Sequence, residues 1–119
     1  MNIRPRHVLQ AVSHETGIPI EMIMGRARWL ENVAARRLYY HAAKEFGLHA
    51  TVIGYAVNRD RSTVIEVTRR RKLSEAERAE LNRVKELTCR IAEKKFKAFK
   101  ADIGKALDRH RAEILERAE

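Results

Sequence analysis

Residues 50–71 read ATVIGYAVNRDRSTVIEVTRRR, and this stretch decides the fold. Its apolar residues predict a short helix from about Ala50 to Val57, which the polar residues 58–60 end in a tight turn. A second helix then runs from Asp60, as its cap, to about Lys72. Two short helices joined by a tight turn are the pattern of a helix-turn-helix.

The start of the second helix carries side chains that can read the edges of DNA bases. Arg61 can donate two hydrogen bonds to guanine, and Asp60 can accept one from cytosine. Ser62 and Thr63 can contact thymine or a phosphate. The alternative is structural, because Asp60 can cap the helix while Ser62 and Thr63 fill its first turn. Spacing alone leaves both interpretations open.

The chain before this pair of helices also predicts helices. Spacing of apolar residues and flanking Gly and Pro indicate helices over 5–16 and 19–24, and a third from Asn32, as its cap, to Phe46. Between the last two lies a basic loop, residues 26–31, around Trp29. We expect Trp29 to close the hydrophobic core, with stacking on nucleic acid as the alternative.

The segment 74–119 predicts amphipathic helix throughout. Ser74 and Glu77 fit a capping box, and apolar residues recur on one face. A single helix of this length would be about 65 Å long, which is long for so small a domain. We therefore expect either a hairpin, with its bend near Thr88 or Gly104, or packing against another chain.

Charge divides the chain in the same way. The chain has 25 basic residues (Lys and Arg) and 16 acidic residues (Asp and Glu). Residues 1–73 contain 13 basic and 6 acidic residues, and residues 74–119 contain 12 basic and 10 acidic residues. The basic first part favours a polyanion, which could be DNA, RNA or an anionic membrane surface. We therefore expect a DNA-binding domain over 1–73 and a helical extension over 74–119, which either covers the domain or forms a homodimer.

Several classes of protein are not expected. No apolar run is long enough to span a membrane, and no phosphate-binding glycine motif suggests a nucleotide. The single cysteine, Cys89, and the spacing of the five histidines predict neither a disulfide framework nor a metal site. With no cofactor and no nucleophile–base pair indicated, we expect a soluble, cytoplasmic, nucleoid-associated protein that is not an enzyme.

Residues 58–64, NRDRSTV, resemble the signature GGRDHTTV of the C-terminal DNA-binding domain of DnaA, the bacterial chromosomal replication initiator. The segment 18–23, IPIEMI, resembles the short apolar helix of that family, and 42–45, AAKE, resembles its next helix. Ile53-Gly54 matches the first helix of the pair. The resemblance covers about residues 8–71 and implies an all-α helix-turn-helix domain.

The resemblance also implies roles for single residues. Arg26 or Arg28 would enter the minor groove, and Arg59 would contact a phosphate. Val64 would touch a thymine methyl. The spacing of the apolar residues predicts instead that Val64 and Val67 face the core. The DNA-contacting residues that we predict are Arg26, Arg28, Arg36, Lys44, Thr51, Arg59, Asp60, Arg61, Ser62, Thr63, Val64 and Arg70.

Two departures from the family alter what the resemblance implies. Arg61 replaces the family's histidine, so the preferred DNA sequence is expected to differ. The ATPase module of the initiator is lacking, so the resemblance implies a stand-alone DNA-binding domain that acts in replication-origin or transcription control, with a phage or mobile element as one natural source. The alternative is a protein-interaction scaffold that uses 74–119 and binds nucleic acid only non-specifically.

Overall fold

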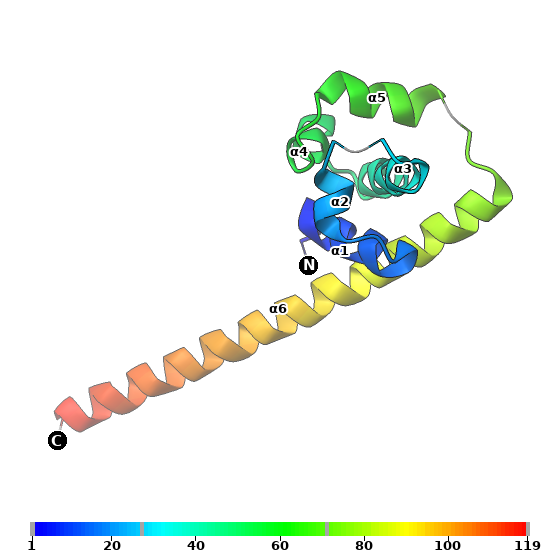
Figure 1. Ribbon diagram of the computed structural model, residues 1–119. Coiled ribbons are helices and arrows are strands. Elements are labelled where there is room, and N and C mark those ends of the chain that lie inside the picture. Colours follow the sequence, from blue (N-terminus) through cyan, green and yellow to red (C-terminus); the bar gives the residue numbers. More distant parts are fainter. Residues whose placement is uncertain (1, 27, 71, 119) are drawn as a thin grey trace.

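The computed structural model describes residues 2–26, 28–70 and 72–118, with all their side chains except those of Arg70 and Ala118. These residues form six α-helices and no strand, so the predicted all-α fold is confirmed (Figure 1). The helices are α1 (Pro5–Thr16), α2 (Ile20–Met24), α3 (Leu30–Glu45), α4 (Ala50–Tyr55), α5 (Arg61–Arg70) and α6 (Glu75–Ala118).

The sequence predicted the ends of the first helix well and the start of the third less well. Gly17 follows α1 with a φ of 74°, the left-handed conformation that glycine adopts without strain. The prediction that Asn32 caps the third helix is wrong, because the cap position is occupied by Trp29, three residues earlier. Asn32 instead lies buried within the helix.

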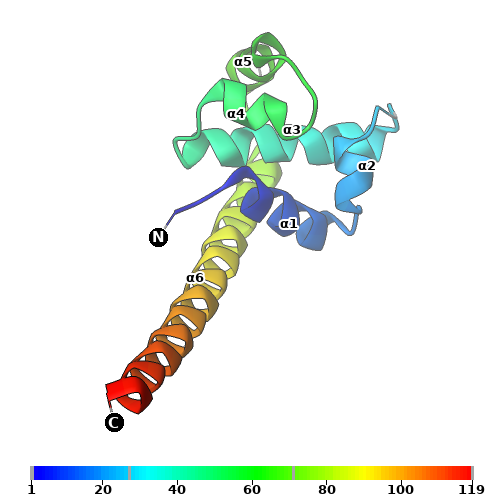
Figure 2. The ribbon, with the colours of Figure 1, turned by 90° about the vertical axis from the view of Figure 1, so that its left-hand side faces the viewer.

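Helix α3 lies at the centre of the domain, and all five other helices pack against it (Figure 2). The core draws apolar side chains from every helix: Val8, Val12, Ile23, Ala35, Tyr39, Ile53, Val64, Leu81 and Val84. The hydroxyl of the fully buried Tyr39 donates a 2.9 Å hydrogen bond to the backbone oxygen of Ile53. This bond satisfies a buried polar atom and fixes α4 on α3.

The segment after α5 forms one continuous helix of 44 residues, α6, rather than a hairpin. The hydroxyl of Ser74 accepts a 3.2 Å hydrogen bond from the backbone N–H of Glu77, which is the capping contact expected from the sequence. The first part of α6 packs against α1 and α3, and the remainder projects from the domain (Figures 1 and 2). The molecule is therefore elongated, with a longest dimension of 68 Å.

Ion pairs hold the first part of α6 to the domain. Glu45, at the end of α3, pairs with Arg78 at 2.7 Å and with Lys85 at 3.1 Å. Burial raises the pKa of Glu45, but hydrogen bonds from Lys85 and Arg78 outweigh burial, so its pKa lies below the ordinary value.

Among the helices described, none combines the length and hydropathy that a membrane crossing requires.

Candidate nucleic-acid interface

A tight turn joins α4 to α5, and its geometry depends on two residues. A Cβ atom on Gly54 would lie 2.4 Å from the backbone oxygen of Arg59, so the turn has no room for a side chain there. Asn58 has a φ of 54°, a left-handed conformation that asparagine tolerates better than most residues. Asn58 thus occupies a turn position that suits glycine, where the sequence departs from the signature GGRDHTTV.

Two arginines, one from α3 and one from this turn, bind the loop after α2. Arg36 donates from Nε to the oxygen of Ile23 at 2.8 Å and from a terminal nitrogen to the oxygen of Gly25 at 2.9 Å. Arg59 donates to the same Gly25 oxygen at 2.9 Å and to the oxygen of Val57 at 3.1 Å. The carbonyl of Gly25 therefore joins α3, the turn and the loop at one point.

This junction concentrates positive charge. Burial lowers the pKa of Arg36, and the neighbouring charge of Arg59 lowers it further. Beside them is a surface hollow lined by two more arginines of the loop, and its lining residues are Arg26, Arg28, Val33, Arg36, Asn58 and Arg59. Because like charges repel unless an anion lies between them, the hollow is suited to an anionic group such as a phosphate.

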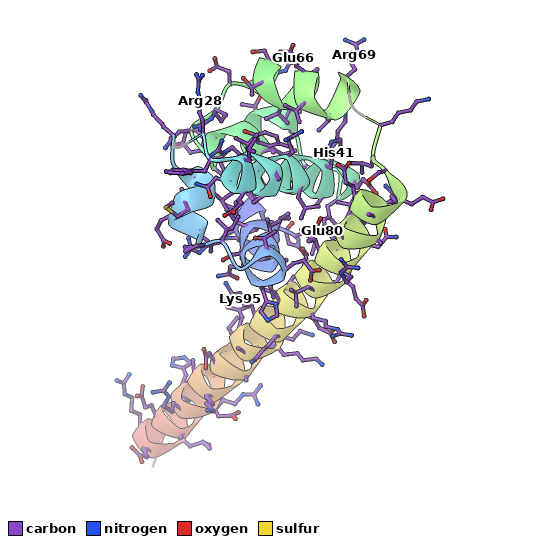
Figure 3. All side chains as sticks on the ribbon, turned by 45° about the vertical axis from the view of Figure 1, so that its right-hand side comes forward. Arg28, His41, Glu66, Arg69, Glu80 and Lys95 are labelled. Carbon is purple, nitrogen blue, oxygen red and sulfur yellow. The ribbon has the colours of Figure 1, made fainter. Side chains whose placement is uncertain are left out.

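Helix α5 turns one face inward and the other outward. Val64 is 1% exposed and lies in the core, and Val67 packs partly buried beside it. The outward face carries exposed side chains at helical spacing, and these are Arg61, Ser62, Glu66 and Arg69. Figure 3 shows Arg28, Glu66 and Arg69 on one side of the molecule, while Lys95 lies about halfway along α6.

The remaining predicted contact residues lie at the edges of this face. Asp60 is exposed and directly precedes α5, and Thr63 is half-buried. Lys44 donates a 3.2 Å hydrogen bond to the hydroxyl of Thr68, which places its amine beside α5. Thr51 is exposed at the start of α4. The side chain of Arg70 lies outside what the structure describes.

Three expectations do not agree with the structure. Val64 lies in the core and cannot touch a thymine methyl. The prediction from apolar spacing, that Val64 faces inward, is therefore the correct one. Arg36 is 7% exposed and its guanidinium donates to backbone carbonyls, so it is directed into the protein rather than toward the surface. Trp29 is 71% exposed and does not close the core, and the neighbouring Leu30 is 84% exposed.

The predicted set of DNA-contacting residues leaves out two members of the outward face. Glu66 and Arg69 follow Ser62 by four and seven residues, which places all three on one side of a helix. This spacing was readable from the sequence, but the signature drew attention only to the first turn. Within the described ranges, no group of three or more His, Cys, Asp or Glu side chains could hold a metal ion.

The fold and this surface define a helix-turn-helix domain in which α4 and α5 form the pair. The family model described as bacterial DnaA protein helix-turn-helix matches residues 5–70 of the 119. The chain therefore belongs to this family, which is a DNA-binding helical domain rather than a catalytic one. No curated protein matches the chain.

Proposed function

We propose that this protein binds double-stranded DNA with a sequence preference, through α5 in the major groove and the 26–31 loop at the minor groove. The observation that carries the proposal is the placement of two basic elements on one side of the molecule. The outward face of α5 and Arg28 share that side, on a framework that Arg36 and Arg59 fasten.

Each exposed side chain of α5 has a chemical counterpart in the groove. Arg61 presents two donors that match the acceptors of guanine, and Glu66 can accept from the amino group of cytosine. Ser62 can donate to a base or a phosphate, and Arg69 is placed to neutralise a phosphate. Specificity then comes from the first two turns of α5, and its far end contributes affinity.

The loop supplies the second contact. A narrow minor groove at A·T-rich steps has a strongly negative potential that attracts inserted arginines. Arg26 and Arg28 are exposed and flank the basic hollow, so either can enter such a groove while the hollow receives a backbone phosphate. In this arrangement the protein acts in replication-origin or transcription control, at sites related to those of the initiator family.

Titrations of labelled duplexes by fluorescence anisotropy test the proposal. We expect affinity to fall steeply with salt, because phosphate neutralisation releases counterions. Arg61→Ala is expected to weaken binding to the preferred duplex by about 1–3 kcal/mol. The matched control Arg90→Ala removes the same charge from α6 and is expected to leave that affinity nearly unchanged. Equal effects of the two variants would contradict the placement of Arg61 in the groove.

A further inference from the structure

The buried face of α6 continues along the helix beyond the point where the domain ends. In the first part of α6, this face consists of the buried residues Leu81, Val84, Thr88 and Ala92. The same face continues with large apolar residues that are 42–60% exposed, namely Phe96, Phe99, Ile103, Leu107 and Ile114. We call these five residues the distal stripe.

The distal stripe has no cover within the described chain. An isolated helix is only marginally stable in water, and most helices depend on packing of an apolar face. Apolar patches that are bordered by charged residues mark interaction surfaces. The family match ends at residue 70, so this surface belongs to a part of the chain that lies outside the helix-turn-helix family.

The charges beside the distal stripe are unevenly distributed along α6. Residues 94–100 contain no acidic residue, and their basic residues are Lys94, Lys95, Lys97 and Lys100. Residues 113–116 contain Glu113 and Glu116 and no basic residue. Two parallel copies would bring like charges together at both ends, whereas two antiparallel copies would bring opposite charges together.

We propose that the distal stripe pairs with that of a second copy of this chain, antiparallel and centred near residue 105. In this register Phe96 meets Ile114 of the second copy, and Ile103 meets Leu107 of the second copy. Four of the five residues of the distal stripe then gain an apolar counterpart, and Lys97 lies opposite Glu113 of the second copy. The pairing covers the stripe of both copies at once, as a two-fold interface requires.

The free length of α6 fits this register. The last buried residue of α6 is Ala92, so the second copy's helix can extend from the centre until its C-terminal end reaches the domain. At that point it would meet the basic N-terminal end of α1, where Arg4 and Arg6 are exposed. Lys95 lies close enough to this end of α1 to contribute to the lowered pKa of His7, after burial. The acidic end of the second copy therefore meets a basic surface.

The dimer gives the protein a further function, which rests on the DNA binding proposed above: it bridges two separate DNA segments. Helix α5 lies on the opposite side of α3 from α6 (Figures 1 and 2). The distal stripe continues the face of α6 that is buried against the domain, so it faces the side on which the domain sits. The two-fold axis therefore directs the α5 helices of the two copies away from each other. With each domain attached near residue 86, the two lie roughly 57 Å apart at about 1.5 Å per residue.

Sedimentation equilibrium of the intact chain tests the dimer. We expect wild-type protein to have twice the mass of the 13.8 kDa chain. Ile103→Glu with Leu107→Glu is expected to give a monomer with unchanged near-ultraviolet circular dichroism. The control, Ala98→Glu with Ala101→Glu, adds the same charges on the opposite, exposed face and is expected to remain dimeric. A monomeric wild type, or equal effects of the two double variants, would overturn the proposal.

Charge reversal tests the antiparallel direction. Glu113→Lys with Glu116→Lys places lysines at both ends of the interface and is expected to weaken the dimer. Adding Lys94→Glu and Lys97→Glu to that variant is expected to restore it, because in this register opposite charges again meet between copies. A parallel dimer would be no weaker in the first variant, because residues 113 and 116 would face the same residues of the second copy. Like charges would meet there both before and after the substitution.

Capture of a second duplex tests bridging. Protein is mixed with a bead-bound duplex and a free fluorescent duplex, and we expect wild type, but not the Ile103→Glu/Leu107→Glu variant, to retain fluorescence on the beads. Both proteins are expected to bind a single duplex equally in anisotropy. Loss of single-duplex binding by wild type would instead contradict the proposed DNA binding. A wild-type dimer that binds one duplex and captures no second one would contradict bridging alone.

Discussion

The junction between the loop and the turn uses arginine in the opposite way to the outward face of α5. At the junction, Arg36 and Arg59 both donate to the oxygen of Gly25, so their hydrogen bonds are directed to the protein itself. On α5, Arg61 and Arg69 are exposed. The comparison teaches that a basic residue in a DNA-binding domain can position the interface or form it, and that hydrogen bonds to backbone carbonyls distinguish the two.

Placing a side chain at Gly54 in the turn is expected to have the largest effect, and this effect is on stability. In Gly54→Ala, the new Cβ would collide with the backbone oxygen of Arg59, so the turn must open. We expect a loss of about 3 kcal/mol or more in the free energy of unfolding, measured by urea denaturation. Gly104→Ala is the control: its Cβ meets nothing within 4 Å, and better helix propensity is expected to add about 0.5–1 kcal/mol. A wild-type urea midpoint for Gly54→Ala would refute this account of the turn.

The distinction between the two kinds of arginine would be wrong if replacing Arg36 affected DNA binding but not stability. Arg36→Ala leaves the backbone oxygen of Ile23 without its buried donor, and we expect it to lower the free energy of unfolding by about 2–3 kcal/mol. Arg61→Ala is expected to leave that free energy within about 0.5 kcal/mol of wild type. If Arg36→Ala unfolded like wild type but bound DNA less well, Arg36 would be a contact residue.

The effect of Arg61 on discrimination between DNA sequences provides a sharper test of the outward face of α5. We expect Arg61→Ala to reduce discrimination at a single base pair by about 1–3 kcal/mol, because a bidentate contact to guanine is lost. The measurement is competition between duplexes that differ only at that base pair. Discrimination that is reduced equally at every position would assign Arg61 to the phosphate backbone.

Arg69 is expected to have a smaller and uniform effect. Arg69→Ala removes one phosphate contact, so binding weakens equally for all sequences, and the slope of log affinity against log salt falls by about one. Titrations of two unrelated duplexes at several salt concentrations check this. A change confined to one duplex would instead make Arg69 a base contact.

The smallest effect is expected where α6 joins the domain. Because hydrogen bonds from Lys85 and Arg78 hold the pKa of Glu45 below its ordinary value of 4.5, the stability that it contributes is present above that value and is lost as pH falls through the lowered pKa. Glu45→Gln is expected to cost less than about 1 kcal/mol at pH 7, because the pairs are partly exposed. Urea midpoints of variant and wild type should converge as the pH is lowered, and a constant difference would exclude Glu45 as the cause.

Much of the fold was predictable because the helices carry local signals. Gly17 ends α1 in a left-handed conformation, and the apolar spacing of α5 placed Val64 inside. The start of α3 was misplaced because a polar residue, Asn32, can be either a cap or a buried member of a helix. The continuous α6 could not be distinguished from a hairpin, because the periodicity of its apolar residues is the same in both.

The candidate site was only partly predictable for a different reason. The signature around Arg59 to Thr63 located the turn and the start of α5, which depend on nearby residues. The roles of Arg36 and Arg59 depend on the carbonyl of Gly25, which approaches them only in the folded chain. No local pattern distinguishes an arginine that will meet a carbonyl from one that will meet a phosphate.

Selection of bound sequences from a random duplex pool, with intact protein at about 150 mM salt, tests the central claim most directly. If α5 reads the major groove, a sharp motif is expected, with a guanine where Arg61 binds and an adjoining A·T-rich stretch for the loop arginines. An absence of enrichment at that salt concentration would contradict sequence-selective binding by α5.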